Sequence, residues 1–153
     1  MSISHMNASV MNTIVIVILT LFALPVAMAG EPRKEFLSDF ILGKYLLVGK
    51  SANSTNTYFG HVEIYSEEEE LRVRRKIGSQ TVQGRAKIEN ANQGETKVLR
   101  VTFDSDGQPY ESTCLIHGDL DNYARISCYL YLREGKTKQP GLEVLFVDHS
   151  TSK

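Results

Sequence analysis

The chain has 153 residues, with 17 basic and 18 acidic side chains and a formal net charge of −1. Such a balanced charge gives no reason to expect binding to nucleic acid or to an anionic membrane surface. The length is that of one domain once an N-terminal leader is set aside.

That leader is an apolar run from Ile14 to Ala27, followed by the small-residue pattern Ala27-Met28-Ala29. It predicts a secretory signal peptide over residues 1–29, because the run is shorter than a membrane span and ends in a cleavage pattern. The alternative of a retained anchor stays open, since residues 1–13 contain no Lys or Arg. We therefore expect export to a periplasm or the cell exterior, with residues 30–153 as the folded domain and no membrane contact after cleavage.

The first predicted element is a short helix over Glu31–Ile41, where apolar residues recur at helical spacing behind Pro32. Eight segments rich in β-branched and aromatic residues follow. They are Lys44–Val48, Thr57–Tyr65, Glu70–Ile77, Thr81–Glu89, Lys97–Phe103, Tyr110–His117, Tyr123–Leu132 and Leu142–Val147.

The connections between these segments are short, such as Gly78-Ser79 and Gly118–Asn122. Short connections join antiparallel neighbours only, because a parallel pair needs a crossover of about a dozen residues. Each of the first seven strands has one apolar face, so closure into a barrel hides both sheet edges most simply. The predicted fold is all-β, an eight-stranded antiparallel up-and-down barrel with a short N-terminal helix.

Alternation along the strands predicts which side chains point inward. In the last strand the orientation stays undecided, because Val144 and Phe146 oppose Leu145 and Val147. The candidate residues of the barrel lumen are Tyr45, Tyr58, Val73, Arg75, Val101, Phe103 and Tyr110.

Two motifs suggest a family. Gly43-Lys44-Tyr45 opens the first strand, and Asp119–Ala124 leads into a strand that contains Cys128. With the Tyr58–Val62 segment, this pattern resembles the lipocalins and the wider calycin group, although Tyr45 stands where lipocalins have Trp. The resemblance implies a barrel open at one end that holds a small apolar or amphipathic molecule, and this is the leading expectation for function.

Small residues on inward positions leave two interpretations of the lumen open. Gly60, Gly84 and Ala86 either leave space for a ligand or allow tight curvature with large side chains filling the gap. Arg75 likewise either pairs with a ligand carboxylate or a lumenal Tyr, or lies at the rim with its head in water. We expect the rim position.

Cys114 and Cys128 flank the turn around Asp119–Asn122 symmetrically. Facing positions on adjacent antiparallel strands bring two sulfur atoms within bonding reach, and an exported protein meets oxidising conditions. We predict a structural disulfide between them.

No pattern points to catalysis, a metal or a cofactor. The acidic run Glu67–Glu70 lacks the spacing of a calcium loop, and His61, His117 and His149 lack metal-ligand spacing. We predict a solvated turn for the acidic run, no catalytic residues and a protein that is not an enzyme.

The second functional expectation is a packed barrel that acts through its outer surface or loops as a protein-binding, inhibitory or host-interaction factor. Phe59, Tyr65, Tyr129 and Tyr131 fall on outward positions of their strands. Exposed aromatic clusters of this kind mark contact surfaces.

Overall fold

The computed structural model describes residues 32–116, 124–135 and 137–151. The predicted signal peptide, the turn around Asp119–Asn122 and His117 lie outside the described residues. Apart from Pro32, the described residues belong to one compact unit, Arg33–Lys153. Among them, no helix is long and apolar enough to cross a membrane.

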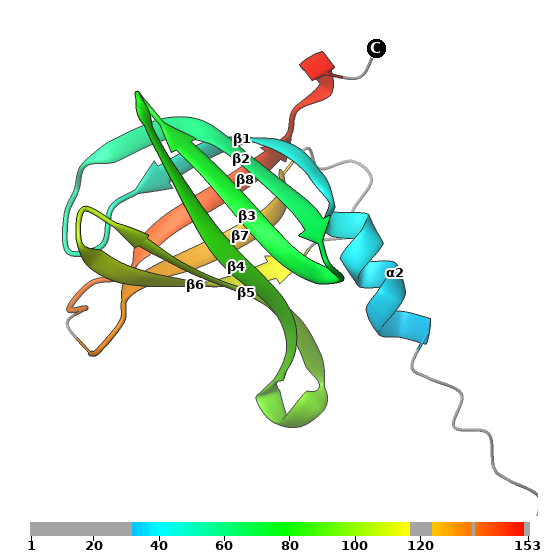
Figure 1. Ribbon diagram of the computed structural model, residues 1–153. Coiled ribbons are helices and arrows are strands. Elements are labelled where there is room, and N and C mark those ends of the chain that lie inside the picture. The colour runs from blue at the N-terminus through cyan, green and yellow to red at the C-terminus, as the bar shows by residue number, and fades with distance from the viewer. Residues whose placement is uncertain (1–31, 117–123, 136, 152–153) are drawn as a thin grey trace, which may run out of the picture. The chain divides into compact units, whose positions relative to one another are not determined.

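Helix α2 (Pro32–Ile41) precedes eight strands (Figure 1). The strands are β1 (Gly43–Lys50), β2 (Thr57–Glu67), β3 (Glu70–Ile77), β4 (Gln80–Ala91), β5 (Thr96–Ser105), β6 (Gln108–Ile116), β7 (Ala124–Leu132) and β8 (Gly141–Val147). Two short 3₁₀ turns are η2 (Asn92–Gly94) and η3 (His149–Thr151).

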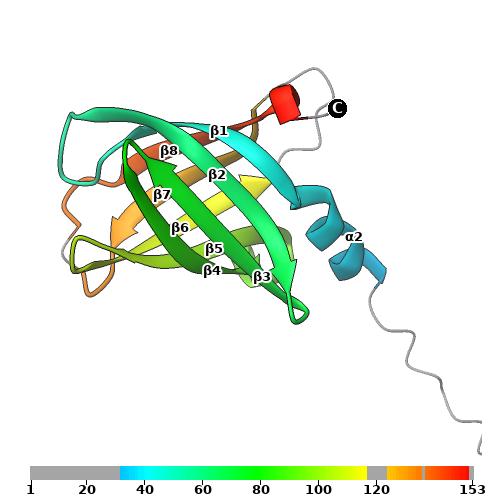
Figure 2. The same ribbon diagram turned by 45° about the horizontal axis from the view of Figure 1, so that its top comes forward.

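Each strand pairs antiparallel with the next, and β8 returns to β1 to close the sheet (Figure 2). The closing register places Leu47 of β1 opposite Leu145 of β8. The predicted closed, up-and-down, eight-stranded barrel with a short N-terminal helix is confirmed. No strand of the barrel is left with a free edge.

The hairpin turns are tighter than the sequence indicates. Only Glu68 and Glu69 separate β2 from β3, and only Asp106 and Gly107 separate β5 from β6. All four residues have positive φ, which matches the right-handed twist of hairpin strands joined by two residues. The expected loop Asp104–Pro109 is therefore largely strand, with Pro109 inside β6.

The inward side chains and one end of α2 form a single hydrophobic core. Ile41 is fully buried, and Leu37 and Phe40 pack against the same core. Tyr45 donates a hydrogen bond from its hydroxyl to the carbonyl of Ile41 at 2.7 Å. This bond satisfies a carbonyl at the helix C-terminus and ties α2 to β1.

At Gly60 and Gly84, the space that a side chain would need is occupied by the backbone of the neighbouring strand. A Cβ atom at Gly60 would lie 2.3 Å from the carbonyl oxygen of Lys76, and one at Gly84 would lie 2.6 Å from that of Thr102. Neighbouring strands approach too closely there for any side chain. These glycines serve the curvature of the barrel, as the second interpretation holds.

Candidate functional site

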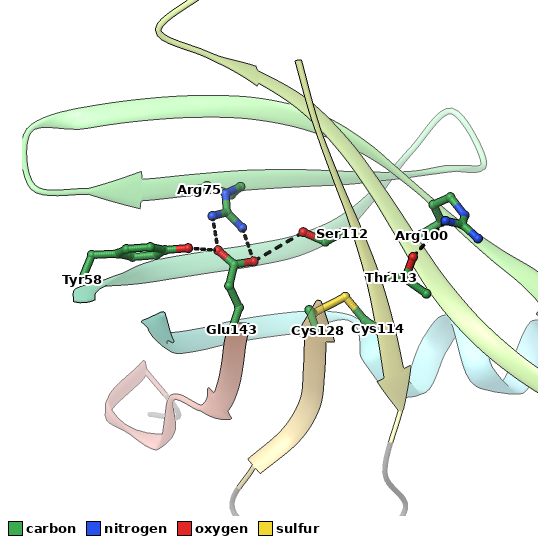
Figure 3. Close-up of a disulfide and its surroundings, with 8 residues drawn as sticks. All are labelled: Tyr58, Arg75, Arg100, Ser112, Thr113, Cys114, Cys128 and Glu143. Atoms are coloured by element: carbon green, nitrogen blue, oxygen red, sulfur yellow. Dashed lines mark hydrogen bonds and ion pairs between the residues drawn. A yellow bond between two sulfur atoms is a disulfide. The ribbon is translucent and has the colours of Figure 1, made fainter. Parts of the chain in front are cut away.

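A buried carboxylate, Glu143 of β8, organises the polar centre of the lumen. Arg75 of β3 holds it with both terminal nitrogens, at 3.1 Å from Nη1 to Oε2 and 2.5 Å from Nη2 to Oε1. Tyr58 donates to Oε1, and Ser112 donates to Oε2 at 3.5 Å. Figure 3 shows the three donors converging on this one carboxylate. Its two oxygens thus accept four hydrogen bonds.

The strand register explains how Tyr58 reaches Glu143. Gly49 of β1 lies between them, opposite Tyr58 on one side and Glu143 on the other. A Cβ atom at Gly49 would come within 2.4 Å of the Tyr58 ring. The missing side chain lets the phenol lie across β1 and present its hydroxyl to the carboxylate.

Arg75 is paired on two sides. Besides the bidentate contact to Glu143, its guanidinium carbon lies 4.2 Å from the centre of the Phe103 ring. Phe103 in turn stacks on Tyr110, with ring centres 5.4 Å apart. Arg75 is only 6 % exposed, so the expectation that its head lies in water at the rim was wrong. A buried guanidinium is retained because a carboxylate and an aromatic face replace its water.

The network shifts the acidity of its members. Burial, and then the adjacent charge of Glu143, raise the pKa of Tyr58 far above its ordinary value. Burial opposes the charged form of Arg75, but the Glu143 carboxylate outweighs it and raises the pKa of that guanidinium. Tyr58 therefore stays protonated, as a donor, and Arg75 stays charged.

We expect this phenol to make the barrel sensitive to alkaline pH. Because its pKa is raised in the folded state, its stabilising effect is complete below the unfolded pKa of about 10 and is lost as the pH rises above that value. The loss reaches at most about 1.4 kcal/mol per pH unit. Urea unfolding of wild type and Tyr58→Phe across this range measures it, and the variant should show the shallower slope. Equal slopes, or the same change in Tyr129→Phe, would contradict the assignment.

Gly49→Ala is expected to displace the Tyr58 ring and to destabilise the protein by about 1–3 kcal/mol, the usual cost of overpacking. The clash is with ring atoms of Tyr58, so the double variant Gly49→Ala/Tyr58→Ala should lose less stability than the two single variants added together. Denaturant unfolding of the three variants gives the comparison. Strictly additive losses would place the strain elsewhere.

The lumen candidates lie together inside the barrel. Tyr45, Val73, Val101 and Phe103 belong to the buried core, and Tyr58 and Tyr110 pack against it half-buried. Around Arg75, however, the described cavities measure only about 10 Å³ and about 30 Å³. Ligand pockets typically measure about 300–1,000 Å³. In this conformation the space beside these candidates is filled by protein side chains.

The disulfide prediction is confirmed. Cys114 and Cys128 occupy directly opposed positions on β6 and β7 and are bonded, with Cα atoms 4.0 Å apart. Both are buried in the core. Cys128 also lies opposite Glu143 in the register, so the bridge adjoins the polar network (Figure 3).

The four aromatic residues predicted to lie on the outside differ in their exposure and contacts. Phe59 is 72 % exposed and Tyr129 is 52 % exposed. Tyr65 is half-buried beneath the guanidinium of Arg74, 5.1 Å from its ring centre. Tyr131 is half-buried, with its ring centre 6.4 Å from that of Tyr129.

Aliphatic side chains connect Phe59 with Tyr129 across four neighbouring strands. Val48 lies between Phe59 and Val144, and Leu46 lies opposite Phe146. Leu142 lies opposite Tyr129. We call this set the outer apolar face. Its members are Leu46, Val48, Phe59, Tyr129, Leu142, Val144 and Phe146, of which the first five are exposed.

Glu143 and Ser112 were not among the predicted site residues. Ser112 alternates with Tyr110 and Cys114, which places it inward, but nothing in the sequence indicates its partner. Glu143 was missed because both faces of β8 are apolar, which hides the alternation that would have turned it inward. One signal could have found Glu143: an arginine on an inward position, such as Arg75, needs a buried carboxylate as its partner.

Within the described residues, no group of three or more His, Cys, Asp and Glu side chains is placed to hold a metal ion. Glu67 and Glu70 of the acidic run instead pair with Arg72. Comparison with models of known protein families and with curated proteins found no match.

Proposed function

We propose that this chain is an exported, lipocalin-like barrel that binds another protein through its outer apolar face. The observation that carries the proposal is the exposure of Phe59 and Tyr129 on a continuous apolar surface spanning β2, β1, β8 and β7. Exposed aromatic and aliphatic side chains in one continuous set are typical of contact sites.

The interior supports this choice over a lumenal ligand. The one buried guanidinium of the described lumen, Arg75, is already paired by Glu143 and Phe103. A ligand carboxylate would have to displace an internal carboxylate that holds four hydrogen bonds. The small cavities nearby give a ligand no entry without rearrangement. A barrel whose lumen is filled around Arg75 is instead suited to presenting a surface.

The interior also gives no support for catalysis. Tyr58, Arg75 and Glu143 converge, but each polar group is bound by another member of the network. A general acid or base needs a substrate atom within hydrogen-bond reach. We therefore retain the proposal that the protein is not an enzyme.

The test is site-specific photo-crosslinking in the native compartment. A benzoylphenylalanine probe replaces Phe59, and a matched probe replaces Gln83, an exposed residue of β4 outside this face. We expect a defined protein adduct from position 59 alone, reduced about tenfold or more by Leu46→Ser, since hot-spot truncation weakens binding by at least this factor. Equal labelling from both positions, or an adduct insensitive to Leu46→Ser, would overturn the proposal.

A further inference from the structure

Cationic side chains border the outer apolar face. Lys50 lies beside Leu142 in the β1–β8 register, and Lys76 lies opposite His61, which is itself next to Leu46. No salt bridge joins Lys50 or Lys76 to another described residue. The nearest outward carboxylate on β2, Glu63, is bound by Arg74 at 2.6 Å. Lys50 and Lys76 thus have no ion-pair partner among the described residues, while the carboxylate of Asp148, whose charge acts on His61, accepts hydrogen bonds from Ser150.

The face is also hollowed beside Phe59. A surface depression of about 570 Å³ is lined by Leu46, Val48, Phe59, His61, Lys76 and Phe146. Gly78, at its edge, has no side chain to fill it, and nothing lies within 4 Å of the place a Cβ would take. An apolar depression with a lysine at its margin fits a protruding side chain that has carboxylates next to it.

We propose that the partner presents a protruding apolar side chain flanked by acidic residues. This inference rests on the proposed function and names the chemistry of its partner. The apolar side chain enters the depression beside Phe59, and the flanking carboxylates pair with Lys50 and Lys76.

Charge and shape argue against two other occupants. A second copy docked symmetrically would set one lysine-bordered patch against an identical one and supply no carboxylates for the lysines, because a two-fold interface repeats one patch on both sides. The headgroups of an anionic membrane would pair with the lysines, but a flat bilayer surface does not fill a depression. A protein segment with an apolar tip and acidic neighbours would both fill the depression and pair with the lysines.

The experiment is a titration of the ¹⁵N-labelled protein, purified from its own compartment, with synthetic peptides. One peptide carries a central Leu-Phe-Leu with three glutamates on each side, and the other carries lysines in their place. We expect the acidic peptide to shift the amide signals of Leu46, Phe59 and Lys76 and to bind at least about fivefold more tightly than the basic one, as two exposed ion pairs allow. The preference should fall at about 0.5 M salt, where exposed charges are screened.

The charge-reversal variant Lys50→Glu/Lys76→Glu should invert this preference. The control Arg85→Glu/Lys87→Glu makes the same change in net charge on β4 and should leave the preference intact. Phe59→Ser should weaken the binding of both peptides. Urea unfolding confirms that each variant remains folded.

Several results would overturn the proposal. They are equal binding of the two peptides, no binding of the acidic one, signal shifts produced by phosphatidylglycerol vesicles in its place, and shifts that grow with protein concentration alone. If the crosslink from position 59 also persists in Lys50→Glu/Lys76→Glu, the outer-face function stands and only the acidic partner is wrong. If position 59 gives no adduct either, both proposals fail.

Discussion

Replacing Glu143 by leucine is expected to destabilise the barrel by about 3–5 kcal/mol, the usual loss when one partner of a buried ion pair is removed. The loss is large because the variant leaves the partners of Glu143 buried without it. Arg75 is 6 % exposed and cannot lose its proton, so it would be left charged in the core. Tyr58 and Ser112 would lose their acceptor in the same step.

The double variant Arg75→Met/Glu143→Leu separates the pair's net contribution from the cost of breaking it. Removing both charges is expected to recover most of the loss, since apolar replacements of buried ion pairs are often neutral. Urea unfolding suits the measurement, because urea does not screen charges as guanidinium does. A coupling energy of at least about 2 kcal/mol is expected from the cycle. Purely additive losses would show that the two side chains do not depend on each other.

The second large effect concerns the disulfide. Cys114→Ala/Cys128→Ala is expected to destabilise the protein by about 3 kcal/mol, because the bridge closes a loop across a sequence separation of 14 residues. The bond constrains the unfolded chain at a point where β6 and β7 already face each other in the native sheet.

Denaturant unfolding of wild type, the double variant and Cys128→Ala provides the measurement. If loop closure dominates, the single variant loses nearly as much as the double, because either change opens the same loop. An unchanged unfolding midpoint in the double variant would show that the bridge contributes nothing. A much larger loss in the double variant than in the single would point to packing at Cys114.

The barrel was predictable because the strand alternation and the turn residues of the sequence indicate the same fold. Seven strands carry a clear alternation, and glycine or acidic turn residues fall between them. The predicted helix Glu31–Ile41 differs from α2 by one residue, and every strand bound lies within two residues of its predicted position. Differences of two residues occur on both sides of the β5–β6 turn, because Asp106 and Gly107 alone complete a turn that Pro109 made look longer.

The lumenal network was only half predictable. Arg75 stood out as a charge on an apolar face, but its partner lies 68 residues away on the strand with two apolar faces. Leu142, Val144 and Phe146 make the outside of β8 apolar, and this same surface belongs to the outer apolar face. The feature that hid Glu143 from sequence reasoning is thus the feature on which the proposed function rests.

Native mass spectrometry of the protein purified from its own compartment tests the central claim most directly, because it reports small molecules and protein partners together. We predict a chain with an intact disulfide and no small molecule in stoichiometric amount, joined by a protein partner that Phe59→Ser releases. A small apolar molecule that is retained by wild type, kept by Phe59→Ser and lost from Phe103→Ala would contradict the account and place the function inside the barrel.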